Sequence, residues 1–348
     1  MRYLAALLCA TSLIAVAAAA QAPRPYVWNL PKGFPTPRVP ADNPMTAAKV
    51  ELGRYLFYDT RLSANGTQSC GTCHEQARAF TDGKARAVGS TGEMHSRGAM
   101  SLVNIAYAGS LTWIDQSLTR LEDQTLVPMY GDHPVELGLQ RPGTALLDRL
   151  RRGHKYQPLF ADAFPADRDP FTIDNVVKAI SSFERTIISA RSPYDRYHTD
   201  RERDAISPAA RRGETLFFSQ PFTCFRCHNG ITMAGATDFE GRERRAEGGI
   251  EFHNTGVSSL PETFKAPTLR NIAVTGPYMH DGSMATLDDV LDHYAAGGRH
   301  ADNPAKSRSI RGFMLTADQR ADFLAFLNSL TDEALLHDPR FADPWSRK

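Results

Sequence analysis

The pentapeptide CGTCH at residues 70–74 is repeated in pattern as CFRCH at residues 224–228, and together they contain every cysteine except Cys9. In each, two cysteines stand three positions apart and a histidine follows directly. The spacing places both thiols on one side of a helical turn. C-x-x-C-H is the attachment pattern of haem c, in which the thiols bond the porphyrin and the histidine binds the iron. We therefore expect two haems, one on each of the following sets: Cys70, Cys73 and His74; Cys224, Cys227 and His228.

Paired cysteines have two other common uses, local disulfides and a four-thiolate zinc site. Zinc does not require a histidine after both pairs, and zinc knuckles so far apart in a chain are unusual. A disulfide likewise gives no reason for the two histidines. Haem attachment accounts for all six residues.

The N-terminus of the 348-residue chain has the form of a secretory signal. Arg2 precedes an apolar run at residues 4–17, and alanines occupy residues 18–20. We therefore expect residues 1–20 to be a signal peptide cleaved near Ala20, and the mature protein to be periplasmic without a membrane span. The formal net charge is +1 with no basic block, so nucleic acid is a poor candidate partner.

The rest of the chain divides into an arm and two domains. Prolines crowd residues 21–44, which favours an extended N-terminal arm. Similar short motifs, AAKVELGRYLF and AARRGETLF, precede the two pentapeptides, and the glycine in each permits close approach by another helix. We expect one haem domain at residues 45–205 and a second haem domain at residues 206–348.

Two longer helices are predicted from apolar periodicity and capping signals. One follows Thr172, and the other follows Thr316, where Gln319 completes a capping box. Their apolar faces consist of Ile173, Val176, Val177, Ile180, Phe183 and Ile187 in the first, and of Phe323, Phe326, Leu327 and Leu330 in the second. Alternating strand patterns are lacking, so we predict a mainly α fold, with two cytochrome-c-like haem domains packed side by side.

The ligand opposite each pentapeptide histidine decides the chemistry, because an open iron face can bind peroxide and a closed one only exchanges electrons. In residues 277–298, a helix is predicted between Thr286 and Gly297. Tyr294 lies on its apolar face, and periodicity alone favours Tyr294 as a core aromatic residue. Met279 and Met284 remain alternative ligands.

Five segments resemble the bacterial di-haem cytochrome c peroxidase superfamily. They are YDTRLSANGTQSCGTCH, LTWIDQSLTRLEDQTLVPMYGDHPVELGL, VVKAISSFERT, CFRCHNG and FKAPTLRNIAVTGPYMHDGSMATL, and they are distributed over the mature chain. The second segment is most similar to the branch that contains the MauG and MbnH di-haem enzymes.

The resemblance implies a role for a tyrosine in the second domain. Tyr294 stands fourteen residues after His280, at the interval where the peroxidases carry a ligating methionine and MauG-like enzymes carry tyrosine. It therefore implies Tyr294 as the distal ligand of the second haem. A phenolate stabilises oxidised iron, whereas a thioether favours reduced iron.

Four further residues have roles that the resemblance implies. Trp113 matches the tryptophan that relays electrons between the two haems. Gln124, Pro128 and Glu136 match the pocket of the peroxide-binding haem, and Glu136 would move a proton between the peroxide oxygens. The alternatives without a catalytic role are that Trp113 only packs in the core and that Glu136 is an ordinary surface carboxylate.

His95 and a possible calcium site are less well matched. Some peroxidases carry a displaceable histidine near His95, but the spacing differs, so we expect the first haem to be open or water-ligated. The family holds calcium between its domains through an asparagine and two backbone carbonyls. Thr275 and Pro277 match the carbonyl positions, whereas Gly98 follows Arg97 where the asparagine is expected.

The resemblance implies an exported di-haem c enzyme that uses hydrogen peroxide to oxidise an aromatic residue of a partner protein through a high-valent state of both haems. The implied partner is an exported, MbnP-like copper-binding protein whose tryptophan becomes kynurenine. One alternative is a cytochrome c peroxidase that takes electrons from a small cytochrome or cupredoxin. The other is a non-enzymatic di-haem electron carrier.

Overall fold

The computed structural model describes residues 24–235 and 252–346, so the expected signal peptide lies outside the described residues. The α-helices in these ranges are α1 (Ala47–Phe57), α2 (Cys70–Cys73), α3 (Leu121–Tyr130), α4 (Thr144–Arg151), α5 (Tyr156–Ala163), α6 (Ile173–Glu184), α7 (Pro193–Thr199), α8 (Pro208–Phe217), α9 (Leu287–Ala295), α10 (Ala317–Asn328) and α11 (Glu333–His337). The short 3-10 helices are η1 (Thr60–Leu62), η2 (Gln76–Arg78), η3 (Ile105–Tyr107), η4 (Cys224–Arg226) and η5 (Ile272–Val274). Within the same ranges, β-pairing is confined to isolated bridges. The prediction of a mainly helical fold is confirmed.

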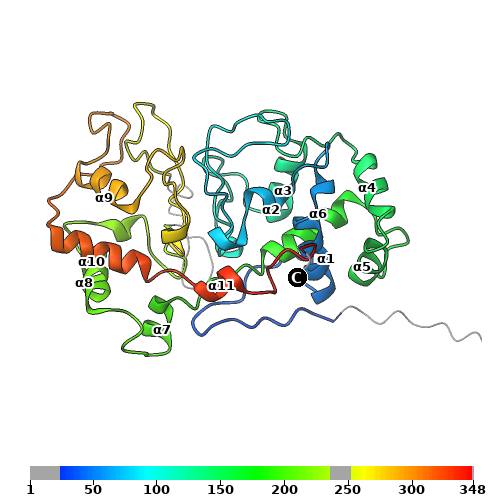
Figure 1. The fold of residues 1–348 in the computed structure, drawn as a ribbon, viewed down its shortest axis with the longest axis horizontal. Coiled ribbons are helices and arrows are strands. Elements are labelled where there is room, and N and C mark those ends of the chain that lie inside the picture. The colour runs from blue at the N-terminus through cyan, green and yellow to red at the C-terminus, as the bar shows by residue number, and fades with distance from the viewer. Residues whose placement is uncertain (1–23, 236–251, 347–348) are drawn as a thin grey trace, which may run out of the picture.

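The helices form two bodies that lie side by side along the long axis of the molecule (Figure 1). Helices α1 to α6 surround one apolar core, and α8 to α10 surround a smaller one. Each body contains one of the two pentapeptides. The fold therefore presents two similar sites, one in each body.

Each body is built on a close helix crossing at a glycine. A Cβ added to Gly53 in α1 would lie 1.9 Å from the carbonyl oxygen of Ala179 in α6. A Cβ added to Gly213 in α8 would lie 1.9 Å from the carbonyl oxygen of Asp322 in α10. The close approach predicted from the repeated motif is thus present in both bodies.

The two long helices begin as their capping signals indicate. The Thr172 side chain accepts a hydrogen bond from Asn175 N at the start of α6, and Thr316 accepts one from Gln319 N at the start of α10. On the predicted apolar faces, every residue except the half-buried Ile173 is buried in the corresponding core. Helix α6 ends at Glu184, so Ile187 belongs to the core but follows the helix.

A buried polar cluster joins the two bodies. Asn104 and Asn271 both adopt left-handed backbone, with φ of 59° and 62°, and each begins a 3-10 helix. Their side-chain amides donate to Ser189, Asn104 to its carbonyl oxygen at 3.0 Å and Asn271 to its hydroxyl at 2.9 Å. Asp332 N donates to Asn271 Oδ1 at 2.7 Å. Because these bonds are buried, they fix the relation between the two bodies.

Both ends of the described chain reach across the molecule. The expected arm at residues 21–44 has irregular backbone where it is described, and Phe34 packs on Tyr107 of the first body while Arg270 of the second lies over its ring. The second domain was expected at residues 206–348, yet its segment from Leu335 onward packs into the first core. None of the helices in the described ranges is long and apolar enough to cross a membrane.

Candidate active site

The first pentapeptide forms a single helical turn, α2, followed by His74. His74 Nδ1 lies 2.8 Å from the carbonyl oxygen of Phe80. Burial lowers the pKa of the His74 imidazole, so its neutral form is favoured. A neutral ring whose Nδ1–H donates to a carbonyl keeps the Nε2 lone pair for a metal.

The second pentapeptide repeats this arrangement. Its cysteines flank the 3-10 helix η4, and His228 Nδ1 lies 3.2 Å from the carbonyl oxygen of Met233. Burial lowers the pKa of His228 to about 4. Cys70, Cys73 and Cys224 are thiols outside any disulfide, which argues against the disulfide alternative for either pair. The donors at both pentapeptides therefore fit covalently bound haem.

Tyr294 faces the second pentapeptide. It lies near the end of α9, which begins at the N-cap Thr286 as predicted. Burial raises the pKa of the Tyr294 phenol, and the nearby thiols of Cys227 and Cys224 raise it further. Tyr294 is not among the described residues that form the second apolar core, and its ring lies 5.1 Å from that of His293.

The alternative ligand Met284 has a fully buried side chain, and its backbone carbonyl oxygen accepts a hydrogen bond from Tyr278 N at 2.7 Å. His293, beside Tyr294, is also buried, with Nε2 at 2.9 Å from the carbonyl oxygen of Thr255 and Nδ1 accepting from Arg299 N at 3.2 Å. These bonds hold the end of α9 in place.

Glu136 lies beside the first pentapeptide. Burial raises the pKa of its carboxyl group to about 7. Burial is also the main cause of the raised thiol pKa values of Cys70 and Cys73, and the charge of Glu136 adds to both. The carboxyl group is thus within electrostatic reach of both thiols.

Gln124 and Pro128 lie one turn apart on α3, which runs beside the Glu136 segment. The carbonyl oxygen of Pro128 accepts a hydrogen bond from Leu137 N at 2.9 Å. Gln124, Pro128 and Glu136 are all half-buried. The structure therefore brings the three predicted pocket residues onto two adjoining segments.

His95 joins this group, a placement that its sequence spacing did not indicate. His95 Nε2 lies 3.9 Å from Glu136 Oε1. Burial lowers the pKa of His95, while it raises that of Glu136. Both groups are thereby shifted toward their neutral forms.

Asp82 was also missed by sequence reasoning. Its side chain is 5% exposed, and its Oδ2 has no hydrogen-bond partner among the described residues. Its charge acts on the pKa values of Cys73 and His74, after the larger effect of burial. The sequence shows only that an aspartate follows the first pentapeptide by a few residues. Its burial, which distinguishes it from other aspartates, is visible only in the structure.

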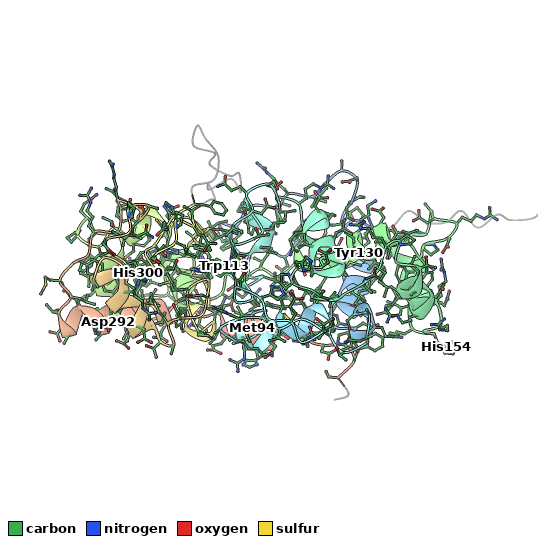
Figure 2. All side chains as sticks on the ribbon, turned by 90° about the horizontal axis from the view of Figure 1, so that it is seen from above. Met94, Trp113, Tyr130, His154, Asp292 and His300 are labelled. Carbon is green, nitrogen blue, oxygen red and sulfur yellow. The ribbon has the colours of Figure 1, made fainter. Side chains whose placement is uncertain are left out.

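Trp113 lies where the two bodies meet. Its Nε1 donates to the carbonyl oxygen of Gly98 at 2.9 Å, and Gly98 N donates to the carbonyl oxygen of His280 at 2.9 Å. Lys265 N donates to the carbonyl oxygen of Trp113 at 2.9 Å. Figure 2 shows Trp113 between His300 in one body and Tyr130 in the other. Trp113 therefore lies at the contact between the two bodies, and its role as a relay stays a prediction.

The same contact contains an aromatic stack. The rings of Phe264 and His280 lie 3.7 Å apart between centroids and nearly parallel, and Arg97 lies over Phe264 at 5.9 Å.

Gly98, where the family's calcium-binding asparagine is expected, offers no side-chain ligand, and both of its backbone polar groups are hydrogen-bonded. The structure therefore adds no support for calcium at Thr275 and Pro277.

Comparison with known proteins identifies the class. The family model described as di-haem cytochrome c peroxidase matches residues 47–203. The chain is 33% identical to the methylamine utilization protein MauG of Methylorubrum extorquens, covering 88% of this chain and 84% of that protein. It is 35% identical to the cytochrome-c peroxidase IdrP1 of Denitromonas iodatirespirans, covering 96% and 94%.

A solved structure is similar over nearly the whole fold. It is the crystal structure of a MauG-like protein associated with microbial copper homeostasis, at 40% identity and a TM-score of 0.87, covering 92% of this chain and 100% of that one. The chain belongs to the di-haem cytochrome c peroxidase and MauG family. It is therefore an oxidoreductase of a family that carries two haem c groups and reacts with peroxide, and the alternative of a non-enzymatic carrier loses its support.

Proposed function

We propose that this enzyme uses hydrogen peroxide to oxidise an aromatic residue, a tryptophan, of an exported partner protein. The observation that carries the proposal is that the Tyr294 phenol lies within electrostatic reach of the thiols of the second pentapeptide. A phenolate at that position disfavours reduced iron, so the second centre is poorly suited to taking electrons from a small electron-carrier protein. It is better suited to holding an oxidising equivalent until a partner residue supplies an electron.

The chain's own residues define the parts of this reaction. Cys70, Cys73 and His74 would hold one haem, and Cys224, Cys227, His228 and Tyr294 the other. Bound haem c supplies iron that exchanges single electrons and, where one face is open, admits peroxide. Glu136 accepts a proton from one peroxide oxygen and returns it to the oxygen that leaves as water. Gln124 and Pro128 shape the space beside Glu136.

Electrons return from the partner by way of the contact between the two bodies. Each hydrogen peroxide takes up two electrons and two protons to become two waters, and the electrons leave the partner's ring singly. Trp113 lies in the contact and is the aromatic relay that this route needs. Kynurenine formation also inserts oxygen, so it takes more than one turnover.

The proposal of a particular partner is supported by a relative and not by this chain's own residues. The similar MauG-like protein is associated with copper homeostasis. We therefore propose an MbnP-like copper-binding protein as the substrate, with both proteins in the periplasm. Export rests on the sequence of residues 1–20 alone, and calcium at Thr275 and Pro277 rests on the family resemblance alone.

The test is to mix the enzyme with hydrogen peroxide and either an exported MbnP-like copper-binding protein or reduced cytochrome c. Mass spectrometry of the partner should show a tryptophan converted to kynurenine, while cytochrome oxidation stays slow. Rapid cytochrome oxidation with an unmodified partner would instead establish the second candidate, a cytochrome c peroxidase. The similarity to IdrP1 over nearly the whole chain favours that second candidate.

A further inference from the structure

His95 lies on a hairpin-like loop that is fastened to the Glu136 segment. Val88 and Met94 form an isolated antiparallel bridge, and His95 N donates to the carbonyl oxygen of Ala87 at 2.8 Å. Met94 is the labelled residue of this loop in Figure 2, where it lies near the middle of the long axis. His95 is therefore held on an ordered turn of chain close to the contact between the two bodies.

Three contacts fix this loop against residues 135 and 136. A Cβ added to Gly89 would lie 1.7 Å from the carbonyl oxygen of Val135, so only glycine permits the approach. Ser90 N donates to the carbonyl oxygen of Glu136 at 2.7 Å. Val135 N donates to a carboxylate oxygen of Glu93 at 3.0 Å. The backbone thus sets the distance between the His95 and Glu136 side chains.

The side chains of His95 and Glu136 lie close to each other. His95 Nε2 and Glu136 Oε1 are 3.9 Å apart, and the side chains are 19% and 36% exposed. That distance is slightly longer than a hydrogen bond, and catalytic contacts commonly shorten when substrate binds. Because burial favours the neutral form of both groups, they form a proton donor and acceptor rather than a fixed ion pair.

We infer that His95 is the proton-exchange partner of Glu136. His95 Nε2 takes the proton of the neutral Glu136 carboxyl group, which frees the carboxylate for hydrogen peroxide, and returns it after water leaves. One proton moves between the two side chains, no electron moves, and no proton is consumed. The inference rests on the proposed function, because it assigns Glu136 the proton transfer of the peroxide reaction.

Other charged groups face this pair and bear on its titration. They are Asp82, Glu93 and Arg97, whose charges act on His95, whereas burial alone accounts for the raised pKa of Glu136. Of these, Asp82 and Glu93 favour the charged imidazole and Arg97 disfavours it. His95 is a positioning residue in this scheme, since it acts through Glu136.

The test compares His95→Gln with the wild-type holoenzyme, with His154→Gln as the matched control. His154 is exposed and lies far from Met94 and Trp113 in Figure 2. Infrared spectra are recorded over a range of pH, and the spectra of Glu136→Gln are subtracted. The difference reports the protonation of the Glu136 carboxyl group without any turnover. We expect His95→Gln to shift that titration and to slow the reaction with hydrogen peroxide by about 10- to 100-fold near neutral pH, with the resting ferric spectrum unchanged.

Two results would overturn the inference. One is a changed spin state of the resting iron in His95→Gln, which would make His95 an iron ligand. The other is an unchanged Glu136 titration and an unchanged peroxide rate, in a variant that keeps both haems and its helical circular dichroism. His95→Asn repeats the test if His95→Gln folds poorly. These measurements use the enzyme and hydrogen peroxide without a partner protein. If the enzyme failed to oxidise a partner, the proposed function would be contradicted, but the result for His95 and Glu136 would still hold.

Discussion

The two pentapeptides share their local structure and differ in what faces them. In both, the histidine Nδ1 lies against a backbone carbonyl oxygen, that of Phe80 in one and of Met233 in the other. The first is faced by the acid Glu136, accompanied by His95, whereas the second is faced by the phenol of Tyr294. Under the proposed function, the same attachment motif would serve two different tasks. The task is set by side chains that distant parts of the chain bring to it.

The largest expected effect is the loss of one haem at a time. Replacing Cys70 and Cys73 by alanine, or Cys224 and Cys227 by alanine, removes both thioethers of one haem, so we expect each double variant to retain about half of the covalently bound haem. Only the variant at Cys70 and Cys73 should lose the reaction with peroxide, because the first site carries the acid–base groups. Haem staining, intact mass and stopped-flow absorbance measure the three outcomes. Equal loss of the peroxide reaction in both variants would contradict the division of tasks.

Replacing the carboxyl group of Glu136 tests the role assigned to the first site. Glu136→Gln should slow the peroxide reaction by roughly 10²- to 10⁴-fold. Burial raises the pKa of Glu136 to about 7, so the fraction of Glu136 present as the proton-accepting carboxylate increases as the pH rises through that value. The wild-type rate should therefore rise as pH increases through about 7, and that rise should vanish in the variant. Glu75→Gln, at an exposed position near the same pentapeptide, is the control and should retain the wild-type profile.

Substitutions at the two glycine crossings compare how much each crossing contributes to the free energy of unfolding. Gly53→Ala and Gly213→Ala each place a methyl group within 1.9 Å of a backbone oxygen, so each should reduce the free energy of unfolding by about 3 kcal/mol or abolish folding. Denaturant titrations followed by circular dichroism measure the loss. Thr215→Ala, exposed on α8, should change it by less than about 0.5 kcal/mol. If each glycine variant shifts a different transition, the bodies unfold separately despite the cluster at Ser189.

The smallest expected effect concerns the contact between the bodies. Trp113→Phe keeps an aromatic ring and removes the hydrogen bond from Nε1 to Gly98, which should reduce stability by about 1 kcal/mol. The reaction with peroxide should be nearly unchanged, while oxidation of a partner should slow, because only the relay is altered. Stopped-flow absorbance and mass spectrometry of the partner separate the two steps. Equal rates of partner oxidation in both proteins would remove Trp113 from the route.

Much of this could be predicted because the relevant signals are local. Thr172, Thr316 and Thr286 were predicted as helix starts because a capping side chain reaches only a few residues along the backbone. The glycines of α1 and α8 were predicted at close crossings because they stand within a repeated helical motif. The pairing of His95 with Glu136 was not predicted. It depends on the fold of the loop at Gly89, and apolar periodicity gives no information about the fold of a loop.

By itself, the sequence determined where haem can be attached, where the helices start and which helix faces are buried. Each of these is encoded within a few neighbouring residues, by thiol spacing, capping oxygens and apolar period. Only the tertiary structure decided what faces each pentapeptide, where Trp113 lies between the bodies, and that the segment from Leu335 onward returns to the first core. The physical reason is that these contacts join residues far apart in the chain, and packing and hydrogen bonding bring them together only when both bodies have formed.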